Sequence, residues 1–387
     1  MLNARIGSSV NSEVQLAGRE AASCVKDLKD LKMAFVYSGV QFDQKELLKT
    51  IGDELPGVPL IGNTSFTGVI TNEGYIAGEN GFVGLMGVSG DDLVVGIAGL
   101  AKEGTARATG RRVAELAMAN AGKAEAPSYF YMVASPGEEE LYLKGITDVI
   151  GRVPLFGGSA ADNSITGEWE LFTGDMVTTD GVAVAFFYTD HAFANEYTGA
   201  YDESNHVGIA TKVKDLRTLV EIDGVPALEK YQEWTNTSHE EIIGGNLLVY
   251  SITAPLGVKD PLGDLVAIRH PMNGNEDGTI SVGNNLAENT AIILMEGSID
   301  GLLESVQEAI DKVNEKLGTS PSFYHLVHCG GRRAGIGERI DELAERLQKA
   351  AGDVPFICEF TFGEYGYEDD GKNTCGGLML SFTAFGE

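Results

Sequence analysis

The sequence has little positive charge, little cysteine and no long apolar run. Its 28 lysines and arginines stand against 57 aspartates and glutamates, so the formal net charge is −29. Such a surface repels phosphate backbones and anionic headgroups, and we expect neither nucleic-acid nor membrane binding. No stretch reaches the length of a membrane span, and the N-terminus lacks the apolar core of a secretory signal. Four cysteines in 387 residues, with no CxxC pair, do not make a disulfide framework. We therefore expect a cytoplasmic protein with reduced thiols.

Common metal and phosphate signatures are also missing. The chain contains no HExxH and no P-loop or GxGxxG after an expected strand. His325 and His328 form the closest histidine pair, but their odd spacing puts them on opposite faces of a strand. We therefore predict no metal site and no cofactor.

What the sequence does contain is a threefold recurrence. An apolar strand, a helical segment and a second strand opening on Val-Pro follow one another three times. The three first strands are 33–37, 128–133 and 324–327, and each is followed by a helix and a strand near 58–61, 153–156 or 354–357. This order predicts crossover units in which the two strands of each unit are parallel neighbours.

Antiparallel signals lie between these units, for example around Gly90-Asp91. The mixture predicts an α+β protein of two related domains, whose mixed sheets are covered by helices and stack as an α-β-β-α sandwich. We place a lead-in helix in residues 1–30, a first domain over 31–212 and a second over 213–387. Within the second domain we expect a strand over 247–252 and a helix over 298–317.

Short motifs throughout the chain carry a family resemblance. In the first half they are Pro59 to Gly68 and Gly157 to Asn163. In the second half they are the segments 220–228, Arg269-His270-Pro271, 329–333 and 363–366, with Asn373-Thr374. In this order and spacing the chain resembles the FIST sensory proteins over nearly its whole length. It departs from the family pattern at Asn63, where a cysteine is usual, and in the final polar turn of the first domain.

The resemblance implies a module that binds a small molecule such as an amino acid. FIST modules often sit beside a kinase or cyclase output domain, and this sequence shows none. We therefore expect a stand-alone sensor that passes its signal to a separate protein, such as a histidine kinase. A subset of the family resembles haem-bearing gas sensors, which makes His270, His325 and His328 alternative haem ligands.

The ligand site is predicted where the polar turns follow the parallel strands. Ligands in α/β arrangements gather beyond the carboxyl ends of such strands, and interfaces between domains often hold small-molecule sites. Arg332 or Arg333 would meet a carboxylate, and Glu364 or Asp162 an amine. The candidate ligand-binding residues are Asn63, Thr64, Ser65, Ser159, Asp162, Asn163, Arg332, Arg333, Glu364 and Asn373. An ion pair between the arginines and Glu364 or Glu338 is the structural alternative.

Cys329 raises the alternative of an enzyme. A nucleophilic thiol needs an adjacent base, and no cysteine–histidine pair is visible in the sequence. We therefore interpret Cys329 as a buried structural cysteine and assign no catalytic residue. A thiol-dependent or amidohydrolase-type enzyme using Cys329 remains the runner-up to the sensor, and an adaptor that acts through protein contact is a third class.

Overall fold

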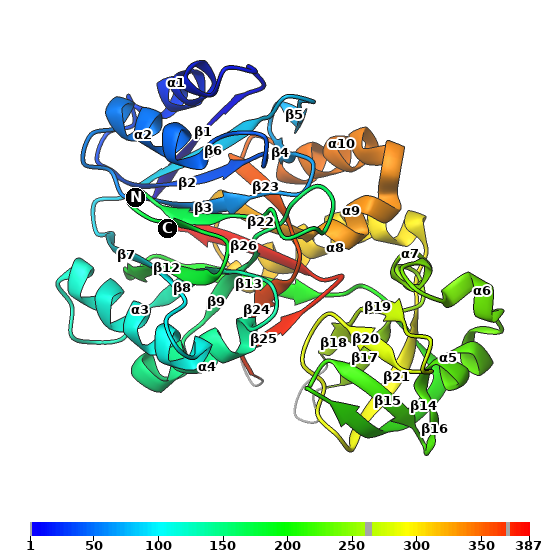
Figure 1. Ribbon diagram of the computed structural model, residues 1–387. Helices are drawn as coiled ribbons and strands as arrows, with labels where there is room; N and C mark the ends of the chain where they lie inside the picture. Colours follow the sequence, from blue (N-terminus) through cyan, green and yellow to red (C-terminus); the bar gives the residue numbers. More distant parts are fainter. Residues whose placement is uncertain (1, 260–264, 369–371) are drawn as a thin grey trace.

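A computed structural model describes residues 2–259, 265–368 and 372–387. Three sheets with the same internal order form its main body (Figure 1). Sheet 1 runs β1 (Asn3–Ser9), β6 (Val83–Ser89), β2 (Leu31–Ser38), β3 (Leu60–Thr64), β10 (Leu171–Thr173) and β11 (Val177–Thr178). Sheet 2 runs β7 (Val94–Ala101), β12 (Gly181–Tyr188), β8 (Tyr129–Ala134), β9 (Leu155–Ser159), β24 (Glu364–Gly366) and β25 (Thr374–Gly376). Sheet 3 runs β13 (Phe193–Thr198), β26 (Leu380–Gly386), β22 (Pro321–Cys329), β23 (Phe356–Thr361), β4 (Val69–Thr71) and β5 (Gly74–Ile76).

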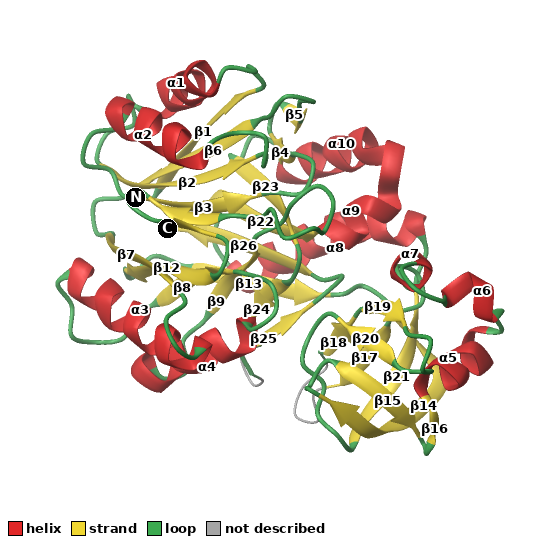
Figure 2. Ribbon diagram, viewed as in Figure 1, coloured by secondary structure: helices red, strands yellow, loops and turns green. Residues whose placement is uncertain are grey.

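Helices cover the outer face of each sheet (Figure 2). They are α1 (Val14–Val25) and α2 (Gln44–Glu54) on sheet 1, α3 (Ala106–Ala121) and α4 (Glu139–Ile150) on sheet 2, and α8 (Ile299–Leu317), α9 (Gly330–Ile336), the 3₁₀ turn η1 (Gly337–Arg339) and α10 (Ile340–Ala351) on sheet 3. Local sequence sets their ends. Thr105 and Ser298 accept a backbone N–H in the first turns of α3 and α8. Gly122, with φ of 67°, ends α3 in the left-handed conformation that glycine tolerates best.

The predicted parallel pairs are confirmed in all three units. Strand β2 pairs parallel with β3, β8 with β9, and β22 with β23. In each unit the first strand of the parallel pair also has an antiparallel neighbour on its other side. This neighbour is β6, β12 or β26. The threefold strand–helix–strand order in the sequence is therefore a threefold repeat in space.

Each unit contributes a short hairpin to the sheet of another unit, in a cyclic order. The hairpins are β4–β5, β10–β11 and β24–β25. After β3, strand β4 leaves the first unit and pairs with β23 in sheet 3. After β9, strand β10 leaves the second unit and pairs with β3 in sheet 1. After β23, strand β24 leaves the third unit and pairs with β9 in sheet 2. Each sheet therefore contains strands from two units, and no unit completes its sheet alone.

The inner faces of the three sheets meet in one core. Phe35 of sheet 1 lies 5.1 Å from the ring of Tyr131 of sheet 2 and 4.7 Å from His325 of sheet 3. Tyr129 of sheet 2 lies 5.6 Å from Phe385 of sheet 3. The α+β class with mixed, helix-covered sheets is confirmed.

A smaller domain is inserted between β13 and α8 of the third unit, at the lower right of Figure 1. Its strands are β14 (Asp202–Lys214), β15 (Thr218–Ile222), β16 (Val225–Pro226), β17 (Leu256–Lys259), β18 (Val266–Arg269), β19 (Pro271–Gly274), β20 (Ile280–Val282) and β21 (Thr290–Glu296). Its helices are α5 (Ala227–Thr235), α6 (His239–Ile242) and α7 (Asn246–Tyr250). The domain forms one antiparallel sheet with its own apolar core. Within the described residues, no helix is both long enough and apolar enough to cross a bilayer.

Three local predictions need correction. The strand predicted over 247–252 is largely helix α7, which contacts β19 and places Leu247 in the core of the inserted domain while Val249 is exposed. The segment Gly330-Gly331, which follows the strand predicted over 324–327 and where a polar turn is expected, is the start of helix α9. Residues 1–30 contain, besides a helix, the edge strand β1, which pairs antiparallel with β6. The division into domains at residue 212 stays a prediction.

Candidate functional site

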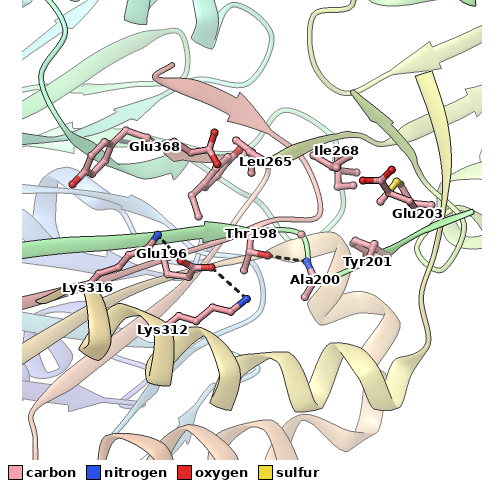
Figure 3. A pocket seen from close by; sticks show the side chains of 15 residues that line it. Glu196, Thr198, Ala200, Tyr201, Glu203, Leu265, Ile268, Lys312, Lys316 and Glu368 are labelled. Atoms are coloured by element: carbon pink, nitrogen blue, oxygen red, sulfur yellow. Dashed lines mark hydrogen bonds and ion pairs between the residues drawn. The ribbon is translucent and has the colours of Figure 1, made fainter. Parts of the chain in front are cut away.

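Three hollows lie between the described parts of the three-sheet body and the inserted domain, and the one between α4, Arg269 and Asn285 is lined by the predicted residue Asn373. Another, with a volume of about 360 Å³, is lined by β13, the start of β14 and helix α8. Figure 3 shows Lys312 and Lys316 of α8 pointing toward Glu196 of β13. The lysine nitrogens lie 4.0 and 2.6 Å from the Glu196 carboxylate, so these charges already satisfy one another. This polar groove offers little apolar surface to a ligand.

The third hollow, which we call the central cavity, has a volume of about 280 Å³. All three units reach it just beyond the carboxyl ends of their parallel strands, and the inserted domain closes it from the other side. Its apolar lining consists of Phe66, Pro136, Ile165, Trp169, Leu248, Val249, Ile252, Met272, Ala334 and Phe362. Its polar lining consists of Arg217, His270, Asn284 and Cys329. A mainly apolar enclosure with a few convergent polar groups is the usual form of a small-molecule site.

Three aromatic side chains build one wall of the central cavity. The Phe362 ring lies 5.8 Å from Phe66 and 6.1 Å from Trp169, and the Trp169 contact is edge-to-face at 87°. The Trp169 indole N–H donates to the Thr179 carbonyl at 3.1 Å, which fixes the ring. The wall therefore combines one residue from each unit and is rigid enough to hold a flat or branched apolar group.

Cys329 lies at the end of β22 and the start of α9, and it pairs with Thr361, the residue before Phe362. Its Sγ accepts hydrogen bonds from the backbone N–H groups of Gly331 at 3.3 Å and Leu378 at 3.2 Å. Leu378 has a φ of 55°, an unfavourable conformation for a leucine, and this conformation accompanies the N–H···Sγ contact. Burial, followed by the nearby Glu364 carboxylate, raises the pKa of the thiol well above its usual range. Cys329 is therefore a neutral thiol at pH 7, buried as predicted.

Glu364 lies next to this thiol and is fully buried. Its carboxylate accepts hydrogen bonds from the Thr361 hydroxyl at 2.9 Å and the Met379 backbone N–H at 2.9 Å. Burial raises its pKa to about 8, although these two donors, the Cys329 thiol and Arg332 all act in the lowering direction. Glu364 is therefore a carboxyl group that changes its protonation state near neutral pH.

His270 and Asn284 reach the central cavity from the inserted domain. The Nε2 of His270 donates to the Leu248 carbonyl at 3.0 Å, which leaves Nδ1 without the proton in the neutral ring. Burial lowers the His270 pKa to about 4, so the ring is neutral at pH 7. Asn284 is 1% exposed, and within the described part of the chain its Nδ2 donates to no acceptor. An unsatisfied buried donor in a cavity wall is a natural contact for a ligand oxygen.

Glycines bring Cys329 and His270 together. The Sγ of Cys329 and the Cε1 of His270 lie 3.5 and 3.4 Å from the point that a β-carbon of Gly331 would occupy. Likewise, the Cβ of His270 and the Oδ1 of Asn284 lie 3.3 and 3.4 Å from the corresponding point of Gly377. Cys329 and His270 therefore both border Gly331, and His270 and Asn284 both border Gly377.

Arg217 joins the inserted domain to the body at the rim of the central cavity. Its guanidinium donates to Glu139 at 2.8 Å and Glu140 at 2.7 Å, both on α4, and to the Gly283 carbonyl at 2.6 Å. Desolvation of the fully buried Glu139 carboxylate, together with the neighbouring Glu140 charge, raises its pKa to about 7. These ion pairs connect α4 to the inserted domain.

None of the predicted ligand-binding residues lines the central cavity, although several lie directly behind it. Arg332 is fully buried and donates to the Gly199 carbonyl at 2.5 Å and the Ser305 hydroxyl at 2.6 Å. Arg333 donates to the Gly337 carbonyl at 2.9 Å and the Tyr75 hydroxyl at 3.2 Å. The two arginines therefore donate hydrogen bonds to carbonyl and hydroxyl groups, in place of the predicted ion pair to Glu364 or Glu338.

The predicted residues of the first unit meet in the core. Asn63 donates to Glu359 at 2.9 Å and accepts from the Tyr131 hydroxyl at 3.1 Å. Thr64 accepts from the Glu170 N–H at 2.9 Å, and Ser65 from the Phe360 N–H at 2.8 Å. These contacts secure the exchanged strands and leave these side chains buried away from the cavity.

The predicted residues of the second unit organise the loop that follows β9. The Asp162 carboxylate accepts backbone N–H groups along 164–168, which holds Ile165 and Trp169 in place at the cavity. Asn163 accepts from the Thr67 N–H at 2.9 Å, and the Ser159 hydroxyl lies 2.7 Å from that of Tyr365. Asn373 donates to the Val153 carbonyl at 2.8 Å, close to residues 369–371, which lie outside the described residues.

Sequence reasoning missed the contribution of the inserted domain to the cavity. From the sequence, His270 stands out only as part of a motif and as a haem candidate. No motif in the sequence marks Asn284 as a ligand-binding residue. The Arg269-His270-Pro271 motif was the available indication, because it places a histidine at the end of a strand.

The structure allows a test of the metal and haem alternatives. Among the described residues, no group of three or more histidine, cysteine, aspartate or glutamate side chains is placed to hold a metal ion. His325 and His328 are fully buried in sheet 3 and line none of the hollows described above, and the Nε2 of His270 is engaged by a carbonyl. The buried positions of His325 and His328 do not fit a haem group.

Comparison with known structures gives only distant likenesses. The chain aligns along its full length with all of a cyanuric acid hydrolase from A. caulinodans, with 10% identity and a TM-score of 0.40. It aligns with 98% of a chorismatase at 9% identity and a TM-score of 0.39, and with 72% of PurLQS from Thermotoga maritima at 11% identity and a TM-score of 0.24. These values support no transfer of activity. No curated protein matches the chain.

Comparison with protein families gives a clear result. Residues 32–225 match the FIST N domain, and residues 227–367 match the FIST C domain. The two matches follow one another along most of the chain and include both sides of the central cavity, as far as the residues of β24. The chain therefore belongs to the FIST family of sensory proteins.

Proposed function

We propose that this protein is a small-molecule sensor whose ligand binds in the central cavity and whose signal passes to a separate protein. The observation that carries this proposal is the position of the cavity. It lies beyond the carboxyl ends of parallel strands, between the body and an inserted domain, with an unsatisfied donor of Asn284 in its wall. Membership of a sensory family supports the same conclusion.

The lining favours a compact and mainly apolar ligand. The aromatic wall would hold its body, and a carbonyl or hydroxyl oxygen would accept from Asn284. A carboxylate, which the sequence predicted, finds less support. Arg217 is the cationic side chain among the described lining residues, and Glu139 and Glu140 already neutralise it. A hydrophobic amino acid would have to compete with these glutamates, whereas a neutral compound would not.

The inserted domain offers a route for the signal. It is joined to the body through the chain crossings into β14 and out of β21, through the cavity wall and through the Arg217 ion-pair group. A ligand that contacts both the body and the inserted domain stabilises their closed arrangement, because it gains its full contacts only there. The partner protein would then distinguish the ligand-bound arrangement from the free one.

Tryptophan fluorescence tests this proposal directly. The chain has two tryptophans, and Trp169 lines the cavity whereas Trp234 belongs to the core of the inserted domain. A Trp234→Phe variant therefore reports on the cavity alone. We expect a saturable change in its emission with a small neutral compound such as benzamide, and a weaker response to phenylalanine.

A matched pair of glycine variants identifies the site. Gly283 lines the cavity, and a β-carbon there would have its nearest neighbour at 3.6 Å, so Gly283→Leu fills the cavity without a clash at its base. Gly245 lies outside the cavity lining and a β-carbon there has no neighbour within 4 Å, so Gly245→Leu is the control. We expect Gly283→Leu to weaken binding at least about tenfold, or 1.4 kcal/mol, and Gly245→Leu to leave it unchanged. Equal affinities in both variants would place the ligand elsewhere.

A further inference from the structure

Cys329 has neighbours that the sensor function does not require. Its thiol borders the central cavity, next to a fully buried carboxyl group, Glu364. Two backbone N–H groups, from Gly331 and Leu378, point at its Sγ. A cysteine that merely fills space needs neither a base nor donors at its sulfur. The arrangement has the parts of a nucleophile beside a base: Cys329 is a neutral thiol at rest, Glu364 can accept its proton, and two N–H groups lie at its sulfur.

We propose that Cys329 is a nucleophile that accepts an acyl group from a small, mainly apolar ester or thioester bound in the central cavity. This inference rests on the proposed use of the cavity for a small neutral ligand. It adds covalent chemistry at one wall of that site.

The atoms balance with no reactant beyond solvent water. Sγ forms a bond to the carbonyl carbon, and the bond from that carbon to the ester oxygen or thioester sulfur breaks. The thiol proton passes to the ionised Glu364 carboxylate, and the alcohol or thiol leaves as its anion, which takes a proton from water. The products are an S-acyl cysteine and the free leaving group. The Gly331 and Leu378 N–H groups hold the sulfur while it carries negative charge.

Asn284 places an unsatisfied hydrogen-bond donor in the wall of the same cavity. It is 1% exposed, it lines the same cavity, and its Nδ2 has no acceptor among the described residues. A carbonyl oxygen that develops negative charge during attack is the acceptor that such a donor lacks. Asn284 therefore qualifies as the group that orients and polarises the carbonyl.

Glu364 is a better proton acceptor than His270. The buried His270 ring has its pKa lowered to about 4, which makes it a weak base, and its Nε2 already donates to Leu248. Burial instead raises the pKa of Glu364 to about 8, so its ionised form is a stronger base than His270 and becomes more populated as the pH rises toward 8. The Thr361 hydroxyl and the Met379 N–H donate to the Glu364 carboxylate and hold it in position, and the Arg332 charge acts on it without a direct bond.

The test uses the full chain and p-nitrophenyl acetate as the probe. Cys24 is exposed, so Cys24→Ser provides both a clean background and a matched control. We expect one equivalent of p-nitrophenolate to be released rapidly, and peptide mass spectrometry to find the acetyl group on Cys329. Cys329→Ser keeps an acceptor for the two N–H groups, and Glu364→Gln keeps the shape of the base. We expect both variants to acylate about 100-fold more slowly or less.

The possible outcomes separate this inference from the proposed function. Acetyl groups found on lysines or Cys24 but not on Cys329 in the folded wild-type protein overturn the nucleophile, whatever the variants do. If the Trp234→Phe variant still reports binding that Gly283→Leu abolishes, the sensor survives that result. Acylation of Cys329 at an unchanged rate in Glu364→Gln overturns the role of Glu364 as proton acceptor.

Discussion

A substitution of Arg332 can test whether this arginine is structural or binds a ligand. Its guanidinium donates to the carbonyls of Gly199, Leu302 and Leu378 and to the Ser305 hydroxyl, at 2.5, 3.3, 3.4 and 2.6 Å. The face of Tyr201 lies 5.9 Å from the centre of the guanidinium. Arg332 thus joins α9 to α8, to the segment before β26, and to the junction where the chain enters the inserted domain.

The expected cost of Arg332→Met follows from these contacts. Methionine retains the apolar stem but leaves the acceptors without their donor. A buried group left unsatisfied costs about 1–3 kcal/mol, and the two short bonds, to Gly199 and Ser305, should account for most of the loss. The folded state of the variant no longer desolvates a cation, which offsets part of this cost. We therefore expect the free energy of unfolding to fall by about 3 kcal/mol.

Urea unfolding followed by circular dichroism measures this change, and Arg333→Met is the matched control. Arg333 makes one bond to a carbonyl and one to the Tyr75 hydroxyl, and its guanidinium is 5.2 Å from the Tyr75 ring. We expect that control to lose only about 1 kcal/mol. If Arg332→Met unfolds like the wild-type protein but no longer binds a ligand, the structural reasoning is wrong and the sequence-based site prediction is right.

Two further predictions concern buried carboxyl groups. The pKa of Glu364 is about 8 in the folded protein, above the usual 4.5, so its stabilising contribution is complete below about pH 4.5 and is lost as the pH rises toward 8. Urea unfolding between about pH 6 and pH 8 should therefore show a shallower loss of stability in Glu364→Gln, by up to about 1.4 kcal/mol per pH unit, and an unchanged slope would contradict the burial argument. Asn63→Asp would put a second carboxylate beside Glu359, and burial already raises the pKa of Glu359 to about 7. Because both groups tend to ionise at high pH, the melting temperature of this variant should fall further below that of the wild-type protein at about pH 8 than at about pH 5. Equal losses at both pH values would mean that the two groups do not interact.

The crossover units could be predicted because their signals are local. Each parallel pair joins strands separated by one helix, and such a connection leaves few alternatives. The register pairs Ala34 with Leu60, Phe130 with Leu155 and Tyr324 with Phe356, at equivalent places in the three units. Apolar runs, helical spacing and the Val-Pro openings together contain this information.

The hairpin exchange and the shape of the site could not be predicted in this way. Strand β4 pairs with β23, which is almost 300 residues later, as the partners Val69 and Glu359 show. Short strands of this kind have no local preference for one sheet over another. Residues 247–252 illustrate a related failure. Their apolar run is compatible with a strand or a buried helix, and packing against the inserted sheet selects α7.

The same exchange explains why the predicted polar turns lie behind the cavity. Because each turn carries the chain into a neighbouring sheet, its backbone groups need partners at the crossing. Ser65 accepts the Phe360 N–H, and Asp162 accepts those along 164–168. The polar residues meet this structural need, and the adjacent side chains Phe66, Trp169 and Phe362 point into the cavity. A motif of small polar residues in this fold therefore marks the position of the site, whereas its chemistry comes from the neighbours of that motif and from the inserted domain.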